Sequence, residues 1–248
     1  MRIAAAACLV ALAAGCGGGA VQHHAAVEAA HVVRCRAGAV QPLGPHKVAY
    51  AAVVRRRLAV YAAPGGRVVA RFTRNNQNGV PTVFSVLGRR VDTRCRATWY
   101  HVELPIRPNG AAGWVRVQAV DVARVRTRIF VDVSQRRLRL YDNGRLVLTS
   151  PIAVGAPGTP TPVGRYYVNQ RLIPTDPSGP YGPGAVGVSA FSNVLTGWAQ
   201  GGPIGIHGTN EPWSIGHNVS NGCIRLPNSV IRRVFRIALA GTPVIISP

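Results

Sequence analysis

Two neighbouring stretches hold the pattern that best indicates the fold and chemistry of this chain: Ile204-Gly205-Ile206-His207-Gly208-Thr209 and Ile215-Gly216-His217-Asn218-Val219-Ser220-Asn221-Gly222-Cys223-Ile224-Arg225-Leu226. They bring together one thiol, two imidazoles and several glycines. A cysteine attacks a carbonyl well only as the thiolate, and histidine is the side chain suited to take its proton near neutral pH. Gly222 lets the backbone approach a substrate closely, and the N–H groups around Cys223 could stabilise an oxyanion. The pattern therefore indicates nucleophilic catalysis.

Two other interpretations of these residues are open from chemistry alone. A single cysteine is commonly a buried, apolar core residue. One cysteine with two histidines could also bind zinc, but only three ligands are visible and their spacing matches no common finger.

The sequence around these stretches predicts β structure. Arg137 to Tyr141 alternates between polar and apolar residues, as a half-buried strand does, and Asp142-Asn143-Gly144 is a hairpin signal. The segment from Gly155 to Pro162 is too rich in proline for a helix. Asn228 to Ala240 carries an apolar stripe at helical spacing, so we expect one helix there. The remaining expected strands are Ile129–Val133, Leu146–Val154 and Thr242–Ser247.

The two stretches, with H-G-T followed by S-x-G-C-I-R-[LM], resemble the catalytic domain of the L,D-transpeptidases (YkuD-like). A second element supports the resemblance: Val154-Gly155 with Gly158 to Tyr167 is similar to the family's G-x-P-G-x-P-T-P-x-G strand and loop. The resemblance covers about Arg128 to Pro248, and we place the domain at residues 123–248. It implies a mainly β, sandwich-like domain with one C-terminal helix.

The resemblance also implies roles for individual residues. Cys223 is expected to be the nucleophile and His207 its base, oriented by a backbone carbonyl because the next residue is Gly208. Arg225 is expected to hold the site or a substrate carboxylate. The expected loop and oxyanion residues are Ser220, Asn221 and Gly222, and the expected substrate-binding residues are Arg225, Gly208, Thr209 and Tyr181.

The implied substrates are peptidoglycan stem peptides. Cys223 would attack the amide before the terminal D-alanine, and the amine of a second stem would resolve the thioester into a 3→3 cross-link. The family resemblance also implies acylation by carbapenems. The implied reaction needs no metal or organic cofactor. An L,D-carboxypeptidase that uses water, and a non-catalytic wall-binding lipoprotein, are the alternative functions.

One position departs from the family pattern. Many members have a second histidine two residues before the cysteine, where this chain has Asn221. That position is therefore not expected to hold an obligatory base. His217 lies in a stretch with the composition of a solvent-facing loop, so we expect it at the rim.

Upstream of the catalytic domain, residues 46–122 are predicted to form a small SH3-like β domain. Short apolar runs alternate with turn signals such as Pro64-Gly65-Gly66. The segments Trp99 to Leu104 and Gly113-Trp114-Val115 resemble the closing hairpin of a bacterial SH3-like barrel.

The N-terminus predicts export. Arg2 precedes the apolar run Ile3 to Ala14, which is too short to span a bilayer and ends in small residues before Cys16. We expect a signal peptide at residues 1–15, lipidation of Cys16 and a flexible tether at residues 16–45. The protein would then lie at the outer face of the cytoplasmic membrane.

Two further cysteines are set in Arg-Cys-Arg triplets, at Cys35 and Cys95. An exported protein can form disulfides. Cys8 lies inside the predicted signal peptide and would be removed with it. Once Cys16 and Cys223 are assigned to lipid and catalysis, Cys35 and Cys95 remain as a pair.

The chain has 29 basic and 8 acidic residues, a formal net charge of +21. Such a protein is drawn to polyanions. The arginines are scattered and no nucleic-acid signature is present, so nucleic acid is not expected as a partner. Anionic wall polymers or lipid headgroups are the favoured anions, with a merely solvated basic surface as the alternative.

Overall fold

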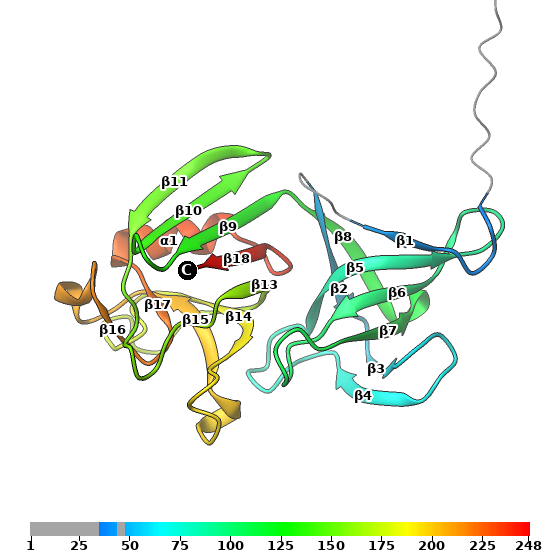
Figure 1. Cartoon of the computed structure of the whole chain (residues 1–248), viewed down its shortest axis with the longest axis horizontal. Coiled ribbons are helices and arrows are strands. Elements are labelled where there is room, and N and C mark those ends of the chain that lie inside the picture. Colours follow the sequence, from blue (N-terminus) through cyan, green and yellow to red (C-terminus); the bar gives the residue numbers. More distant parts are fainter. Residues whose placement is uncertain (1–34, 44–47) are drawn as a thin grey trace, which may run out of the picture. The chain divides into compact units, whose positions relative to one another are not determined.

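The computed structural model describes residues 35–43 and 48–248, and the chain from Arg34 to Pro248 forms one compact unit. The predicted signal peptide, Cys16 and most of the predicted tether lie outside the described residues. Two eight-stranded sheets contain most of the strands of the described chain (Figure 1). Within this part of the chain, no helix is long and apolar enough to cross a membrane.

The first sheet has the order β4-β3-β7-β6-β5-β2-β8, with β1 paired to β5. Its strands are β1 (Val40–Pro42), β2 (Ala49–Val54), β3 (Arg57–Tyr61), β4 (Val68–Thr73), β5 (Val83–Val91), β6 (Ala97–Glu103), β7 (Ala112–Arg116) and β8 (Val120–Val125). The predicted hairpin is present, since Tyr100 of β6 pairs with Val115 of β7 in antiparallel register. The SH3-like class of this sheet stays a prediction.

Strand β1 lies in a segment that the sequence analysis assigned to the tether. Cys35 is joined to Cys95 by a disulfide across 60 residues. Cys95 follows β5, so the bond holds the segment after Cys35 beside that strand. In this segment Val40 pairs with Arg90 of β5. A composition rich in small residues therefore did not reveal this short edge strand.

The second sheet has the order β11-β10-β9-β18-β13-β14-β15-β17. Its strands are β9 (Thr127–Asp132), β10 (Arg137–Asp142), β11 (Arg145–Pro151), β13 (Gly164–Leu172), β14 (Ala185–Phe191), β15 (Pro203–His207), β17 (Ile224–Arg225) and β18 (Pro243–Ser247). The C-terminal strand β18 inserts between β9 and β13, so the chain end closes the middle of the sheet (Figure 1).

Short elements lie outside the two large sheets. The strands β12 (Val154–Gly155) and β16 (Asn218–Ser220) pair in parallel, and three 3₁₀ turns are present: η1 (Val117–Ala119), η2 (Ala199–Gly201) and η3 (Pro212–Ser214). Helix α1 (Asn228–Ile237) is the single α-helix of the described residues. The prediction of a mainly β chain with one C-terminal helix is confirmed.

Helix α1 ends before the predicted Ala240. Gly241 has φ +91° and donates its N–H to Val168 O at 2.7 Å, which draws this part of the chain onto β13. An added Cβ at Gly241 would lie 2.3 Å from Ala51 Cβ. Close packing on β2 and β13 therefore ends the helix earlier than its apolar stripe suggests.

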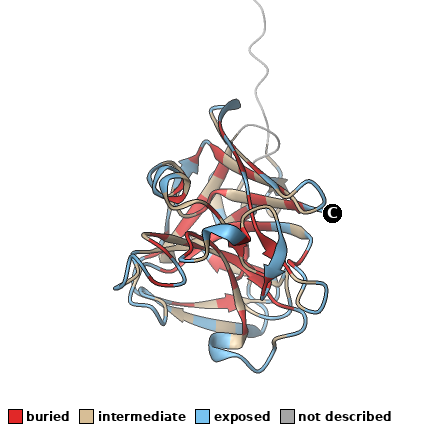
Figure 2. Cartoon of the chain, turned by 90° about the vertical axis from the view of Figure 1, so that its left-hand side faces the viewer, coloured by how far each residue is buried: buried red, intermediate tan, exposed pale blue. Residues whose placement is uncertain are grey.

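The core of the second sheet follows the period-two pattern of its strands. Ile129 and Val131 of β9 and Leu138 and Leu140 of β10 are buried, whereas their chain neighbours face outward. Buried positions run along the strands and exposed ones gather in the loops (Figure 2). Hydrophobic burial on one face thus fixes the register that carries the site residues on β15 and β17.

Hydrogen bonds join the two sheets. Asn109 binds the backbone of Phe191 twice, accepting from its N–H at 2.8 Å and donating to its carbonyl oxygen at 2.9 Å. The buried Glu103 carboxylate accepts from Ser189 Oγ at 2.8 Å. Burial raises the pKa of Glu103 to about 7, against the lowering effect of the Ser189 hydrogen bond. The first sheet is therefore anchored directly on the end of β14, which leads into the site.

Candidate active site

A cavity of about 560 Å³ contains the predicted nucleophile and base in one lining. Its walls include Cys223, His207, Tyr181, Asn221, Trp198 and Gly205. Sheet pairing brings these residues together, because β15 runs parallel to β17 and pairs Ile206 with Ile224. Residues from two separate motifs thus face a single space.

His207 ends β15 and is 5% exposed. Its Nδ1 lies 2.6 Å from the carbonyl oxygen of Gly208. A carbonyl oxygen only accepts hydrogen bonds, so the proton is on Nδ1 and the lone pair is on Nε2. The ring of Tyr181 meets the imidazole edge to face, with centroids 5.0 Å apart.

The charge state of His207 follows from its surroundings. Burial lowers the pKa of His207 to about 4; the hydrogen bond with Gly208 opposes this and the charge of Arg225 adds to it. The imidazole is therefore neutral at pH 7 and able to accept a proton.

Cys223 lies between β16 and β17 and is the one free cysteine of the described residues. Burial raises the pKa of its thiol, while a backbone hydrogen bond from Gly205 and the charge of Arg225 lower it. The raised pKa keeps the resting group as a thiol near neutral pH. Attack on a carbonyl therefore needs a base at the moment of reaction.

Ser220 closes the loop that carries Cys223. Its Oγ donates to Cys223 O at 2.5 Å and accepts from Gly222 N at 3.2 Å. Gly222 has φ +105°, and an added Cβ would lie 3.0 Å from Ile204 Cδ1. Glycine is thus required here by conformation. The Gly222 N–H is already engaged inside the loop, which reduces the donors that the Asn221–Cys223 backbone offers to an oxyanion.

The proline-rich loop before β13 is hydrogen-bonded to the loop that carries Cys223. Thr161 Oγ1 donates to Gly222 O at 2.9 Å and accepts from Gly155 N at 2.8 Å. Thr159 Oγ1 donates to Ser220 O at 3.0 Å. The sequence analysis included both threonines in a family motif but predicted no role for them. Their position next to prolines, within a motif of the catalytic domain, is the sequence feature that could have indicated a structural role.

Arg225 forms an ion pair with Glu211 through Nη1 and Oε2, and the Arg225 side chain is 19% exposed. It is not among the residues that line the cavity. Its connection to the site is electrostatic, since its charge acts on the pKa of both His207 and Cys223. Sequence reasoning missed Glu211, whose separation of fourteen positions from Arg225 forms no recognisable spacing.

Gly208 and Thr209 serve the backbone of the site. Thr209 N donates to Asn228 Oδ1 at 2.8 Å, and a Cβ at Gly208 would lie 2.3 Å from that same oxygen. Gly208 is therefore required by the close approach of Asn228, the first residue of α1. Neither Gly208 nor Thr209 is in the cavity lining.

The remaining predicted residues divide clearly. Tyr181 lines the cavity and is 54% exposed. His217 is exposed and does not line it. In the part of the chain that the structure describes, no group of three or more His, Cys, Asp or Glu residues is arranged to hold a metal ion.

Comparisons with known proteins identify the family of the C-terminal part of the chain. The family model of the YkuD L,D-transpeptidase catalytic domain matches residues 126–246. YkuD of Bacillus subtilis (strain 168) is 34% identical over 150 residues, which cover 58% of this chain and 84% of that protein. YkuD of Bacillus licheniformis is 41% identical over 121 residues, which cover 49% of this chain and 66% of that protein.

A crystal structure of a mutant of the Enterococcus faecium L,D-transpeptidase aligns over 49% of each chain, with 26% identity and a TM-score of 0.39. The chain thus spans about two thirds of the Bacillus licheniformis relative and about half of this solved chain. On the sequence matches, the chain belongs to the L,D-transpeptidase family with a YkuD catalytic domain.

Proposed function

We propose that this protein is a peptidoglycan L,D-transpeptidase that forms 3→3 cross-links through an acyl-enzyme on Cys223. The observation that carries the proposal is that Cys223 and His207 line one cavity, with His207 Nδ1 held by the carbonyl oxygen of Gly208 so that Nε2 is the atom that can accept a proton. Membership of the family supports the reaction class, and this geometry supports the roles of the two residues.

The first step is acylation. Cys223 Sγ attacks the carbonyl carbon of the amide that joins the diamino acid to the terminal D-alanine of a tetrapeptide stem, and its proton passes to His207 Nε2. The new C–S bond forms, the C–N bond breaks, and the imidazolium returns its proton to the departing D-alanine amine. Burial lowers the pKa of His207, so the buried imidazolium gives up its proton readily.

The second step reverses the pattern. The side-chain amine of another stem attacks the thioester carbonyl and gives a proton to His207. A new C–N bond forms, the C–S bond breaks, and the thiolate takes the proton back. Water in place of the amine would give a trimmed tripeptide.

The proposed location of the protein is outside the cytoplasm. A signal peptide, lipidation of Cys16 and an SH3-like companion domain would place the catalyst at the outer face of the cytoplasmic membrane. They rest on the sequence pattern of the N-terminal region.

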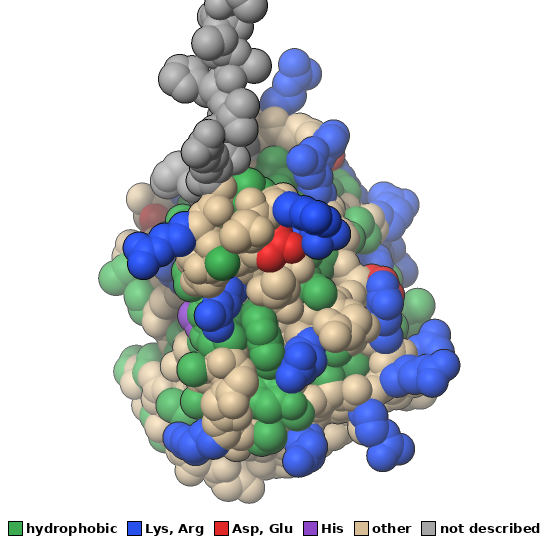
Figure 3. All heavy atoms as spheres, turned by 90° about the vertical axis from the view of Figure 1, so that its right-hand side faces the viewer, with side chains coloured by type: hydrophobic (Ala, Val, Ile, Leu, Met, Phe, Trp, Pro, Cys, Tyr) green, Lys and Arg blue, Asp and Glu red, His purple; other side chains and the backbone are tan. Residues whose placement is uncertain are grey.

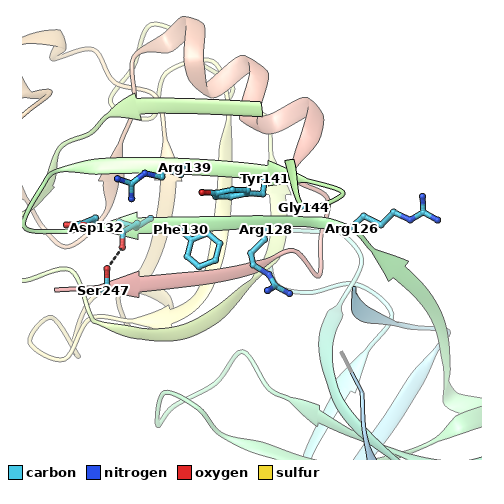
Figure 4. A pocket seen from close by; sticks show the side chains of 9 residues that line it. Arg126, Arg128, Phe130, Asp132, Arg139, Tyr141, Gly144 and Ser247 are labelled. Atoms are coloured by element: carbon cyan, nitrogen blue, oxygen red, sulfur yellow. Dashed lines mark hydrogen bonds between the residues drawn. The ribbon is translucent and has the colours of Figure 1, made fainter. Parts of the chain in front are cut away.

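Anionic wall polymers belong to the proposal as partners. Basic side chains are spread over the face shown in Figure 3, with few acidic ones between them. A basic pocket of about 420 Å³, separate from the cavity that holds Cys223, lies on the outward face of β9 and β10. Its lining includes Arg126, Arg128, Arg139, Phe130 and Tyr141 (Figure 4). Burial and the charge of Arg165 lower the pKa of Arg128, as expected where cations are crowded. A polymer with repeated phosphates would relieve that repulsion.

The function is tested by incubating the protein with a disaccharide tetrapeptide and analysing the products by mass spectrometry. A cross-linked dimer with released D-alanine supports the transpeptidase. Tripeptide alone would indicate the carboxypeptidase, and unchanged substrate would indicate a non-catalytic wall-binding protein.

A further inference from the structure

A second cavity adjoins the catalytic one. Its volume is about 520 Å³, and it shares Asn78, Gln170, Gln200 and Pro203 with the lining that holds Cys223. A single ligand can therefore extend through both cavities, with its reacting carbonyl beside Cys223.

Carboxamides dominate the lining of this second cavity. Asn76, Asn78, Asn169, Gln170 and Gln200 all contribute, together with the aromatic rings of Phe72 and Phe191. Of the described residues that line it, none is acidic and Arg71 is the charged one. Such a surface suits an uncharged ligand rich in hydrogen-bonding groups, with apolar faces for the rings to contact.

The carboxamides are held in a fixed network. Gln170 Oε1 accepts from Asn76 Nδ2 at 2.8 Å and from Asn78 Nδ2 at 2.9 Å. Asn78 Oδ1 accepts in turn from Gln200 Nε2 at 3.0 Å. The network connects the β4–β5 turn of the first sheet to the second, so both sheets build the cavity.

Asn169 is the distinctive member of the lining. The β13–β14 pairing passes from Val168 opposite Val188 to Gln170 opposite Gly187, which leaves Asn169 as the extra residue of a β-bulge. A Cβ at Gly187 would lie 2.7 Å from Asn169 Oδ1, so the glycine makes room for this side chain. Bulges near active sites commonly redirect one side chain.

Asn169 Oδ1 is buried and has no hydrogen-bond partner in the protein. A buried polar atom without a partner costs stability, and such atoms are rare in folded proteins. The Asn169 residue lines the cavity, so a rotation of its side chain would bring this oxygen to a ligand N–H or O–H.

We propose that this carboxamide-lined cavity binds the N-acetylated glycan to which the substrate stem peptide is attached. The inference rests on the proposed function and extends it from the peptide to the sugar. Sugar hydroxyls and acetamido groups match the carboxamides, and sugar ring faces match Phe72 and Phe191. A free peptide carboxylate would find Arg71 as its one cationic partner in this lining, so the glycan is the better fit.

The test compares two substrates in the full protein. Acylation is followed as D-alanine release in a single turnover, with the disaccharide tetrapeptide and with the bare tetrapeptide. We expect Asn169→Leu to lower kcat/KM roughly tenfold for the disaccharide substrate, mainly through KM, as for a lost hydrogen bond to a buried group. The bare peptide and one carbapenem should change less than twofold. Asn193→Ala, an exposed asparagine outside both cavities, is the matched control.

Three results would overturn the inference. Wild-type protein that does not prefer the disaccharide substrate has no glycan site. Equal losses on both substrates and the carbapenem would make Asn169 a structural residue. If Asn169→Leu lowered the yield of cross-linked dimer but left D-alanine release unchanged, the cavity would belong to the acceptor stem.

A binding measurement keeps the inference testable if turnover is absent. In Cys223→Ser protein, the disaccharide without peptide should bind, and Asn169→Leu in that background should weaken its Kd roughly tenfold. Unchanged binding would contradict the glycan site, whereas failure to release D-alanine would contradict only the proposed function.

Discussion

His207 Nδ1 lies 2.6 Å from the carbonyl oxygen of Gly208, the residue that follows it in the chain. The contact fixes the tautomer, because the carbonyl can only accept. Nε2 is therefore the basic atom of a buried ring that lines the cavity with Cys223. No second side chain is needed to orient the His207 ring.

His207→Ala should lower the rate of carbapenem acylation by at least about a hundredfold, since general-base assistance typically contributes 10²–10⁴-fold. His217→Ala is the matched control, because His217 is exposed and outside the cavity lining. Stopped-flow acylation with one carbapenem, after circular dichroism confirms folding, measures both. A strongly reduced acylation rate in His217→Ala, together with a near-normal rate in His207→Ala, would contradict the assignment.

Glu103→Gln should stabilise the protein at pH 8. Burial raises the pKa of Glu103 in the folded protein to about 7, so folding above that pH buries a carboxylate. The favourable, protonated state is fully present below the unfolded pKa and lost as pH rises through about 7. A shift of this size corresponds to roughly 3 kcal/mol. Thermal unfolding from pH 4 to pH 8 should show a Tm gain that shrinks toward zero at low pH. A gain that is constant with pH would show that another property of the amide causes it.

The disulfide between Cys35 and Cys95 should hold in solution and stabilise the fold by roughly 2–4 kcal/mol. Native, non-reduced protein should resist alkylation at both positions. Replacing both cysteines by serine should lower the denaturant midpoint by a corresponding amount. Alkylation of both thiols before reduction would refute the pairing.

Cys16 should carry lipid, because small residues precede it at the end of the apolar N-terminal run. Globomycin, or the change Cys16→Ala, should block processing or release the protein from membranes. Mass spectrometry of the mature N-terminus decides the point. A different first residue without an acyl group would be inconsistent with lipidation.

Much of the second sheet was predictable, because period-two burial and strong turn residues are local signals. Asn143 and Gly144 have positive φ in the expected hairpin, and β15 ends at His207 as a short buried strand. Long-range partners were not predictable from such signals. No local sequence signal indicates the ion pair of Glu211 with Arg225, the hydrogen bond of Thr161 to Gly222, or the β-bulge at Asn169. These relationships depend on which strands become neighbours.

The most direct test of the central claim is the intact mass of the protein after reaction with one carbapenem, compared with that of Cys223→Ser. We expect the wild-type protein to gain the mass of one drug molecule, with peptide mapping placing it on Cys223. The serine variant should gain none on the same timescale, because a hydroxyl is a far weaker nucleophile than a thiol paired with His207. An adduct that forms at the same rate in Cys223→Ser would place the chemistry elsewhere and contradict the account.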